Sequence, residues 1–247
     1  MEGIYIDINC DVGEGVGNEA DLLPLISSCN IACGGHAGDD WSMAQVVKLA
    51  KQYSVHVGAH PSYPDKENFG RLTMDIGSTE LTNNIRGQIH ALKTILDEEQ
   101  VSLHHIKPHG ALYNDLAKNE ALVDLFLRAI ASYKESVVLY APPGSVIAKK
   151  AIKHDYKVKL EAFADRSYNQ DLSLVSRKLP NAVLNDPKIV LDHLVKMVHE
   201  NKVVTIDGRE SHIEAQTYCL HGDTPNALQI LTYLSEELPK KQIYIQK

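Results

Sequence analysis

The chain has 247 residues, of which 44% are hydrophobic and 23% are charged, and its formal net charge is −7. This length is sufficient for one large hydrophobic core, while the acidic balance without a lysine and arginine cluster argues against nucleic acid or an acidic membrane surface as partner. No apolar run could span a bilayer, the first residues do not resemble a signal peptide, and the four cysteines form no CxxC pair, so we expect a cytoplasmic protein. We also expect one domain over residues 1–247.

Short apolar strands alternate with longer helical patterns along the whole chain. The predicted strands cover residues 4–8, 28–33, 55–60, 104–109, 137–142, 158–163 and 217–222. The predicted helices cover residues 41–53, 78–99, 119–133, 144–154, 186–200 and 224–238. The last two helices each begin with a capping residue followed by proline, in Asp186-Pro187 and Thr224-Pro225.

This alternation predicts an α/β fold with parallel strands surrounded by helices. A closed (β/α) barrel is favoured because several strands are apolar on both faces, and a doubly wound open sheet is the alternative. Two stretches, 167–186 and 203–216, interrupt the alternation and are expected to be loops with short β-ribbons. Asp207-Gly208 marks a turn within the second of them.

Polar residues gather where the predicted strands end. Asp7 and Asn9 alternate with isoleucines of the first strand, so both should point to one face, which in a barrel is the interior. In parallel α/β folds the carboxyl ends of the strands lie on one side of the molecule, which carries the active site. The candidate site residues are Asp7, Asn9, Asp11, His36, His60, Lys107, His109, Asp165, Arg166, His221 and Asp223.

The histidines differ in how strongly their positions indicate function. His60 and His109 stand beside prolines at strand ends, which favours a role in the site. His36 lies in a glycine-rich turn, where a local hydrogen bond is the alternative. His104 and His105 begin their predicted strand, at the end away from the site, and we assign them no role.

For two further pairs of residues, a structural role is the alternative to a role in the site. Asp165 and Arg166 are consistent with an ordinary ion pair within a loop. His221 and Asp223 precede the last predicted helix, where Asp223 or Thr224 is a candidate N-cap, and a cap is compatible with a role in the site.

The same residue types suit acid–base catalysis or a divalent metal ion. Asp11 with His60 and His109, or Asp7 with His36 and His60, would form a mixed carboxylate and imidazole site. No zinc motif such as HExxH is present, and general acid–base catalysis uses the same groups, so both possibilities stay open.

Motifs for binding nucleotides and for serine hydrolases are absent. The sequence contains no GxxxxGK[ST] loop, and GEGVG at 13–17 lacks the spacing of a dinucleotide fingerprint. It also contains no GxSxG element, which argues against a serine hydrolase of that type.

Six motifs carry a resemblance to a known family and extend over essentially the whole chain. They are DINCDVGEG (7–15), NIACGGHAGDD (30–40), GAHPSYPD with FGR (58–71), IKPHGALYN (106–114), EAFADRSY (161–168) and CLHGDTP (219–225). In this order they resemble the LamB/YcsF family. The resemblance implies a seven-stranded (β/α) barrel of the glycoside hydrolase/deacetylase type.

The resemblance also implies an activity, namely opening of the lactam ring of 5-oxo-L-proline to L-glutamate with hydrolysis of ATP. Two partner subunits are implied, and ATP as co-substrate would bind wholly or partly on them, since this chain lacks a phosphate loop. Lys107 or Arg166 would pair with the substrate carboxylate. The alternatives are a metal-dependent carbohydrate hydrolase or deacetylase, and a subunit that only binds substrate.

Roles for the candidate residues follow from the implied reaction. Asp11 or His60 would activate water as a general base, and His109 or His221 would act as the acid. The predicted catalytic residues are therefore Asp11, His60, His109 and His221, and the predicted substrate-binding residues are Asp7, Asn9, His36, Lys107, Asp165, Arg166 and Asp223.

Overall fold

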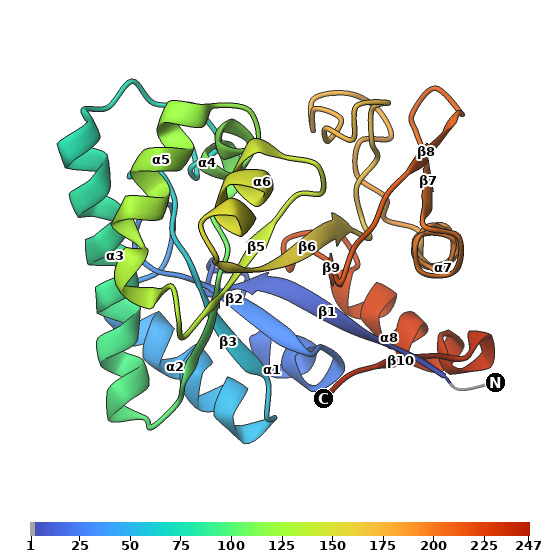
Figure 1. Ribbon diagram of the computed structural model, residues 1–247. Helices are drawn as coiled ribbons and strands as arrows, with labels where there is room; N and C mark the ends of the chain where they lie inside the picture. Colours follow the sequence, from blue (N-terminus) through green and yellow to red (C-terminus); the bar gives the residue numbers. More distant parts are fainter. Residues whose placement is uncertain (1–2) are drawn as a thin grey trace.

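Seven parallel strands close into a barrel in the computed structural model, which describes residues 3–247 (Figure 1). The first six strands are neighbours in chain order, and β9 closes the barrel by pairing with both β6 and β1. The strands are β1 (Ile4–Val12), β2 (Ser28–Ala32), β3 (His56–His60), β4 (Leu103–Ile106), β5 (Val138–Ala141), β6 (Lys157–Phe163) and β9 (Thr217–Cys219). The predicted seven-stranded barrel is confirmed.

Two strands end earlier than the sequence pattern predicted. β4 ends at Ile106 rather than His109, because Pro108 cannot donate to a neighbouring strand and Gly110, with φ of 54°, begins the short helix α4 (Gly110–Leu116). β9 ends at Cys219 rather than at residue 222, and the backbone N–H of His221 donates to the Asp165 side chain. A further short strand, β10 (Ile243–Ile245), was not predicted and pairs with the first residues of β1.

Helices surround the barrel, and all six predicted ones are present. They are α2 (Asp40–Gln52), α3 (Ser78–Glu98), α5 (Glu120–Ala129), α6 (Val146–Lys153), α7 (Pro187–Glu200) and α8 (Ala227–Glu237), with the short α1 (Glu19–Leu22) and α4 in addition. Single 3₁₀ turns lie at Leu23–Leu25, Ala131–Tyr133 and Pro239–Lys241. Along the barrel α2, α3, α5 and α6 pack in sequence, and α7 packs against α8 on the other side (Figure 1).

Of the two predicted helix caps, the one at α7 is present and the one at α8 is not. Asp186 caps α7, accepting hydrogen bonds from the backbone of residues 188 and 189, with Pro187 at the first helical position. The predicted cap of α8 at Thr224 or Asp223 is wrong, because α8 begins only after Asn226, which adopts a left-handed conformation. Thr224 instead donates its hydroxyl to Asp165.

The barrel interior is polar, while the hydrophobic core lies between the strands and the helices. The alternation along β1 buries Ile8 and Cys10 in the hydrophobic core and turns Asn9 and Asp11 into the barrel. His105 of β4 also lies inside, where it contacts the Asn30 side-chain oxygen at 2.7 Å. Burial of so many polar groups requires hydrogen-bond partners, and these hold the strands in register.

The two predicted irregular stretches differ in structure. Residues 203–216 contain most of an antiparallel pair, β7 (Lys202–Val204) with β8 (Glu210–His212), as expected around Asp207-Gly208. Residues 164–186, which include the predicted stretch 167–186, form a long excursion beside the open end of the barrel (Figure 1). It has no regular strand and contains isolated bridges such as that between Tyr168 and Leu174. None of the helices within residues 3–247 is long and apolar enough to cross a membrane.

Candidate active site

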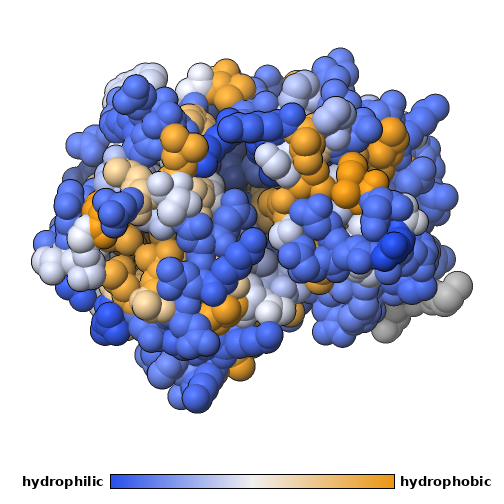
Figure 2. All heavy atoms as spheres, turned by 90° about the horizontal axis from the view of Figure 1, so that it is seen from above, coloured by the Kyte–Doolittle hydropathy of each residue, from blue (hydrophilic) through white to orange (hydrophobic). Residues whose placement is uncertain are grey.

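A cleft of about 330 Å³ opens at the carboxyl ends of the barrel strands. Figure 2 looks down on this end of the molecule and shows the surface hollowed near its centre. Six of the eleven predicted site residues line the cleft, although they come from separate parts of the sequence. These are Asp11, His60, Lys107, His109, Arg166 and His221.

The other five predicted residues lie outside the cleft wall. His36, Asp165 and Asp223 each contact a residue that lines it. Asp7 and Asn9 lie deeper in the barrel, where Asp7 accepts hydrogen bonds from Ser28, Lys159 and Thr217. Their roles in substrate binding stay predictions.

Lys107 lies at the base of the cleft as a buried ammonium group between two carboxylates. Its Nζ is 2.9 Å from Asp11 Oδ1 and 2.9 Å from Glu161 Oε1, and 3.1 Å from the Cys219 sulfur. Burial alone would lower the pKa of Lys107, but Asp11, Cys219 and Glu161 raise it well above its usual value. Burial would raise the pKa of Asp11, which the charges of His60 and Lys107 nevertheless hold well below its usual range. Lys107 and Asp11 are therefore a charged pair.

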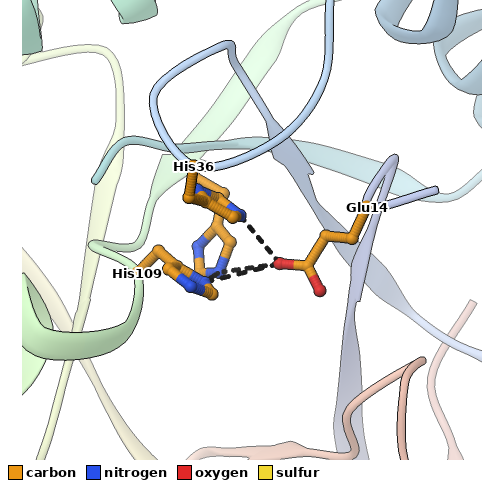
Figure 3. Close-up of side chains that lie close together, drawn as sticks. Glu14, His36 and His109 are labelled. Carbon is orange, nitrogen blue, oxygen red and sulfur yellow. Dashed lines mark hydrogen bonds and ion pairs between the residues drawn. The ribbon is translucent and has the colours of Figure 1, made fainter. Parts of the chain in front are cut away.

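Glu14 and three histidines form a compact cluster on one wall (Figure 3). Glu14 Oε1 is 2.9 Å from His36 Nε2 and 3.4 Å from His109 Nδ1, and it is 4.0 Å from His60 Nε2. The rings of His36 and His109 stack with centroids 3.5 Å apart. Burial and the nearby charge of Asp11 raise the pKa of Glu14, while burial and the charge of His60 lower the pKa of His36 to about 2, so His36 is neutral at physiological pH.

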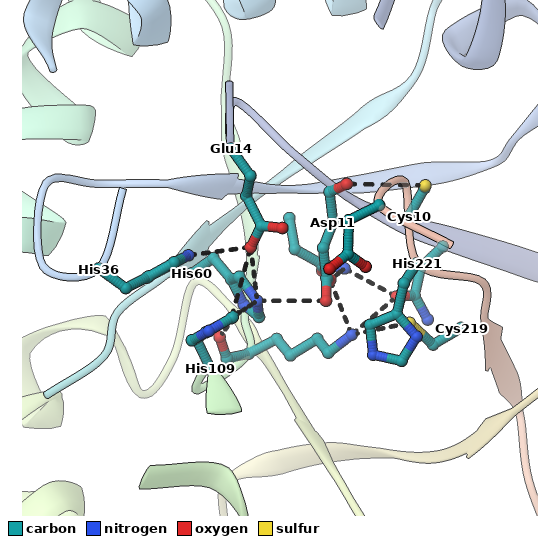
Figure 4. A network of polar contacts seen from close by, with 12 residues as sticks. Cys10, Asp11, Glu14, His36, His60, His109, Cys219 and His221 are labelled. Atoms are coloured by element: carbon teal, nitrogen blue, oxygen red, sulfur yellow. Dashed lines mark hydrogen bonds and ion pairs between the residues drawn. The ribbon is translucent and has the colours of Figure 1, made fainter. Parts of the chain in front are cut away.

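His221 stands on the opposite side of Asp11 from this cluster (Figure 4). Its Nδ1 lies 3.0 Å from both oxygens of Asp165, which also accepts hydrogen bonds from the Thr224 hydroxyl and the His221 backbone N–H. Burial opposes ionisation of Asp165, but His221 and Thr224 lower the pKa of its carboxyl. Asp165 thus fixes the orientation of the His221 ring, as the carboxylate of a catalytic triad does for its histidine.

Arginines surround the mouth of the cleft. Arg71 and Arg177 both reach Asp223 Oδ2, at 2.5 and 3.6 Å. Arg166 is buried and donates to the backbone oxygens of Val175 and Ala182, and burial lowers its pKa to about 10. The expected ion pair between Asp165 and Arg166 is therefore absent here, since each side chain has other partners.

Several residues of the site are not among the eleven site residues predicted from the sequence. Glu14 follows β1 between Gly13 and Gly15, both with positive φ, which lets the loop turn its carboxylate back over the barrel. Glu161 alternates with core residues along β6, so its interior position had a period-two signal. Arg71 and Arg177 belong to loops, and no periodicity indicated that both would meet Asp223.

A closed parallel barrel whose polar cleft lies at the carboxyl ends of the strands is the arrangement of (β/α)-barrel enzymes. Within that class, the chain belongs to the LamB/YcsF family, whose family model matches residues 6–247. The seven-stranded barrel that the resemblance implied is present in full.

Relatives of known name cover nearly the whole chain. The A subunit of 5-oxoprolinase from Haemophilus influenzae (strain PittEE) is 41% identical over 240 residues, which are 97% of this chain and 98% of that protein. A protein of the same name from Acinetobacter baumannii (strain ACICU) is 42% identical over 247 residues, 98% of this chain and 97% of its own. Among solved structures, the lactam utilization protein from Thermus thermophilus superposes with a TM-score of 0.91 at 34% identity, over 98% of this chain and 99% of that one.

Proposed function

We propose that this chain opens the lactam ring of 5-oxo-L-proline to give L-glutamate, in an ATP-dependent reaction that requires partner subunits. The names of its relatives, the A subunit of 5-oxoprolinase and a lactam utilization protein, support this assignment. The observation that carries it is the cleft itself, in which His60 and His221 lie on either side of Asp11 (Figure 4). Groups that can accept or donate a proton therefore stand on two sides of the cleft.

Ring opening needs water to add to the amide carbon and a proton to reach the departing nitrogen. Asp11 or His60 on one side is suited to take a proton from water, and His221, oriented by Asp165, to deliver one on the other. The second acid predicted from the sequence, His109, already donates its Nε2–H to the Phe69 carbonyl. We therefore prefer His221 for that step.

The substrate carboxylate needs a cation at the cleft. Lys107 is already held between two carboxylates, and Arg166 is engaged with backbone oxygens. Arg71 and Arg177 line the mouth with side chains 41% and 28% exposed and share a single carboxylate, Asp223. We assign the substrate carboxylate to these two arginines, whose planar groups suit bidentate contact.

ATP would act by phosphorylating the lactam oxygen, with release of ADP, which makes the carbonyl carbon easier to attack. After water adds and the C–N bond breaks, the new carboxyl group would carry the phosphate, and a second water would release it as inorganic phosphate. The sequence lacks a phosphate-binding loop, so the nucleotide is assigned to the partner subunits, two of which are expected from the family. A cytoplasmic location, as predicted, would supply ATP. The same acidic and imidazole groups also suit a divalent ion, the other possibility predicted for Asp11, His60 and His109.

The test compares the purified chain with the complex it forms with its partner subunits, measuring glutamate formed from 5-oxoproline and ATP. The complex should form glutamate and the chain alone should not. Within the complex, His60→Ala should reduce the rate about 10²–10⁴-fold, the usual effect of losing an acid or base group. His90→Ala, on the exposed face of α3, is the matched control and should leave the rate unchanged. Full turnover by the isolated chain would overturn the division of labour, and a complex inactive on 5-oxoproline would overturn the assignment.

A further inference from the structure

We propose that Glu14, His60 and His109 bind one divalent metal ion, with Asp11 at the edge of the same site. The proposal is based on the geometry of the buried donor atoms. An ion bound there would occupy His60 Nε2, which leaves Asp11 as the base of the proposed lactam reaction. All four residues line the cleft, whereas His36 is not among the lining residues.

Hydrogen bonds to backbone oxygens fix the ring orientations of His60 and His109, so that one nitrogen of each ring faces the other ring. His60 Nδ1 lies 2.7 Å from the Lys107 backbone oxygen, and His109 Nε2 lies 2.9 Å from that of Phe69. A carbonyl oxygen only accepts, so each of these nitrogens carries the hydrogen. In the neutral rings the remaining nitrogens, His60 Nε2 and His109 Nδ1, therefore present lone pairs to each other at 3.0 Å.

Two lone pairs at this distance repel, so without an ion the two nitrogens must share a proton, which gives His60 the positive charge that faces Asp11. A metal ion would take the place of this proton. A histidine that ligates a metal usually donates its other ring N–H to a backbone carbonyl or a carboxylate, which is the arrangement of both rings here. The site therefore has the outer hydrogen bonds of a metal centre in addition to the donor atoms.

A carboxylate completes the donor set. Glu14 Oε1 lies 3.4 Å from His109 Nδ1 and 4.0 Å from His60 Nε2, and Asp11 Oδ2 lies 3.3 Å from His60 Nε2. Ligand atoms about 2.1 Å from a tetrahedral ion lie about 3.4 Å from one another. The observed separations are close to that value, so only small side-chain movements are needed to hold an ion.

His36 supports the site without ligating the ion. Its Nε2 lies 2.9 Å from Glu14 Oε1, and its Nδ1 is buried without a hydrogen-bond partner in residues 3–247. Ligation through Nε2 would move the hydrogen to Nδ1, where it would have no acceptor. His36 instead donates to Glu14 and positions its carboxylate.

A neighbouring group of ligand-type side chains is unsuited to a cation. Asp11, Cys219 and His221 also converge, but the ammonium group of Lys107 lies 2.9 Å from Asp11 Oδ1 and 3.1 Å from the Cys219 sulfur. This positive charge already occupies that location. The nitrogen and oxygen donors of the Glu14 site favour Zn²⁺, Mn²⁺ or Co²⁺, and its opening to the cleft leaves a coordination position for water.

The experiment is a titration of the purified full-length chain, freed of metal by a chelator, with Zn²⁺, Mn²⁺ and Co²⁺ separately. Calorimetry measures stoichiometry and affinity, and the visible spectrum of Co²⁺ reports its coordination. We expect one equivalent to bind with at least one of the three ions. His60→Gln, His109→Gln and Glu14→Gln should each weaken binding at least 100-fold, and His36→Gln by about 10–100-fold, the usual loss for an outer-shell partner.

The control is His104→Gln. His104 stacks on His56 with ring centroids 4.2 Å apart, at the start of the strands, and is another place where imidazoles approach each other. This variant should bind the ion as the wild type does. Circular dichroism and thermal unfolding check that each variant is folded.

Three results would overturn the proposal: no saturable binding of any of the three ions, binding that persists in folded variants of the three ligands, or binding lost in His104→Gln. Because the readout is metal binding to the isolated chain, the outcome is separate from whether the complex opens 5-oxoproline.

Discussion

At the scale of single residues, the site depends on buried charges that stabilise one another. Lys107 is almost fully inaccessible to solvent, yet it is charged because Asp11 and Glu161 lie on either side of it. A buried ion pair contributes little net stability relative to a hydrophobic replacement, but removal of one member leaves an uncompensated charge. The arrangement therefore fixes the positions of Asp11 and Glu161 at the base of the cleft.

Lys107→Met tests this dependence, since it removes the charge and keeps most of the side-chain volume. It should lower the free energy of unfolding by about 3–5 kcal/mol, because two carboxylates remain buried without their cation. Urea unfolding at neutral pH measures the change, with Lys153→Met on the exposed end of α6 as control. A loss below about 1 kcal/mol would show that Lys107 does not compensate these charges.

Asp165 provides a pH-dependent prediction. The pKa of Asp165 is lower in the folded chain than in the unfolded chain, where it is about 3.9. Its ionised form therefore stabilises the fold at pH values above about 3.9. This contribution is lost as the pH falls through the folded pKa. Asp165→Asn should therefore lower the free energy of unfolding at pH 7, by about 1–3 kcal/mol, and by progressively less below about pH 4. Equal destabilisation at pH 7 and pH 3 would contradict the charged role.

At the scale of elements, the excursion over residues 164–186 forms one side of the cleft without regular secondary structure. Its later part is joined to its first residues, next to the end of β6, through Arg166, whose guanidinium donates to Val175 and Ala182. Arg177, which reaches Asp223 at the mouth, belongs to the same excursion. The excursion is thus held by side chain–backbone hydrogen bonds together with scattered backbone hydrogen bonds and isolated bridges, without a continuous β-ladder.

Arg166→Met should release this excursion while the barrel stays folded. We expect faster amide hydrogen exchange across residues 174–184, with exchange in β1 and β2 unchanged, because the lost hydrogen bonds belong to the excursion alone. In the complex, KM for 5-oxoproline should rise more than kcat falls, since the mouth would lose its arrangement of arginines. Unchanged exchange in that segment would show that other contacts hold it.

At the scale of the whole molecule, much of the architecture could be predicted from the sequence. The alternation of Asp7, Asn9 and Asp11 with apolar residues indicated a polar barrel interior, and the polar residues at strand ends indicated a common site. Periodicity reports which face a side chain takes, so it succeeds where strands and helices are regular.

The rest of the site depends on tertiary contacts that no local pattern encodes. Glu14 lies in a glycine-flanked loop, and only the fold brings it onto His36 and His109. His105 received no predicted role, because it lies near the start of its strand, away from the expected site. Inside the barrel it packs against Gly58, and a Cβ added to Gly58 would lie 2.1 Å from His105 Nε2. Short elements such as α4 carry too few residues for a periodic signal.

The central claim is that His60 and His221, from opposite walls of one cleft, act on the same ring. A double-mutant cycle in the complex, measuring glutamate formation, tests it most directly. His60→Ala and His221→Gln should each reduce kcat about 10²–10⁴-fold, and the double variant should be little slower than the worse single one, because groups that act as a unit are strongly non-additive. Losses that multiply in the double variant, or a single variant with the wild-type rate, would contradict the account.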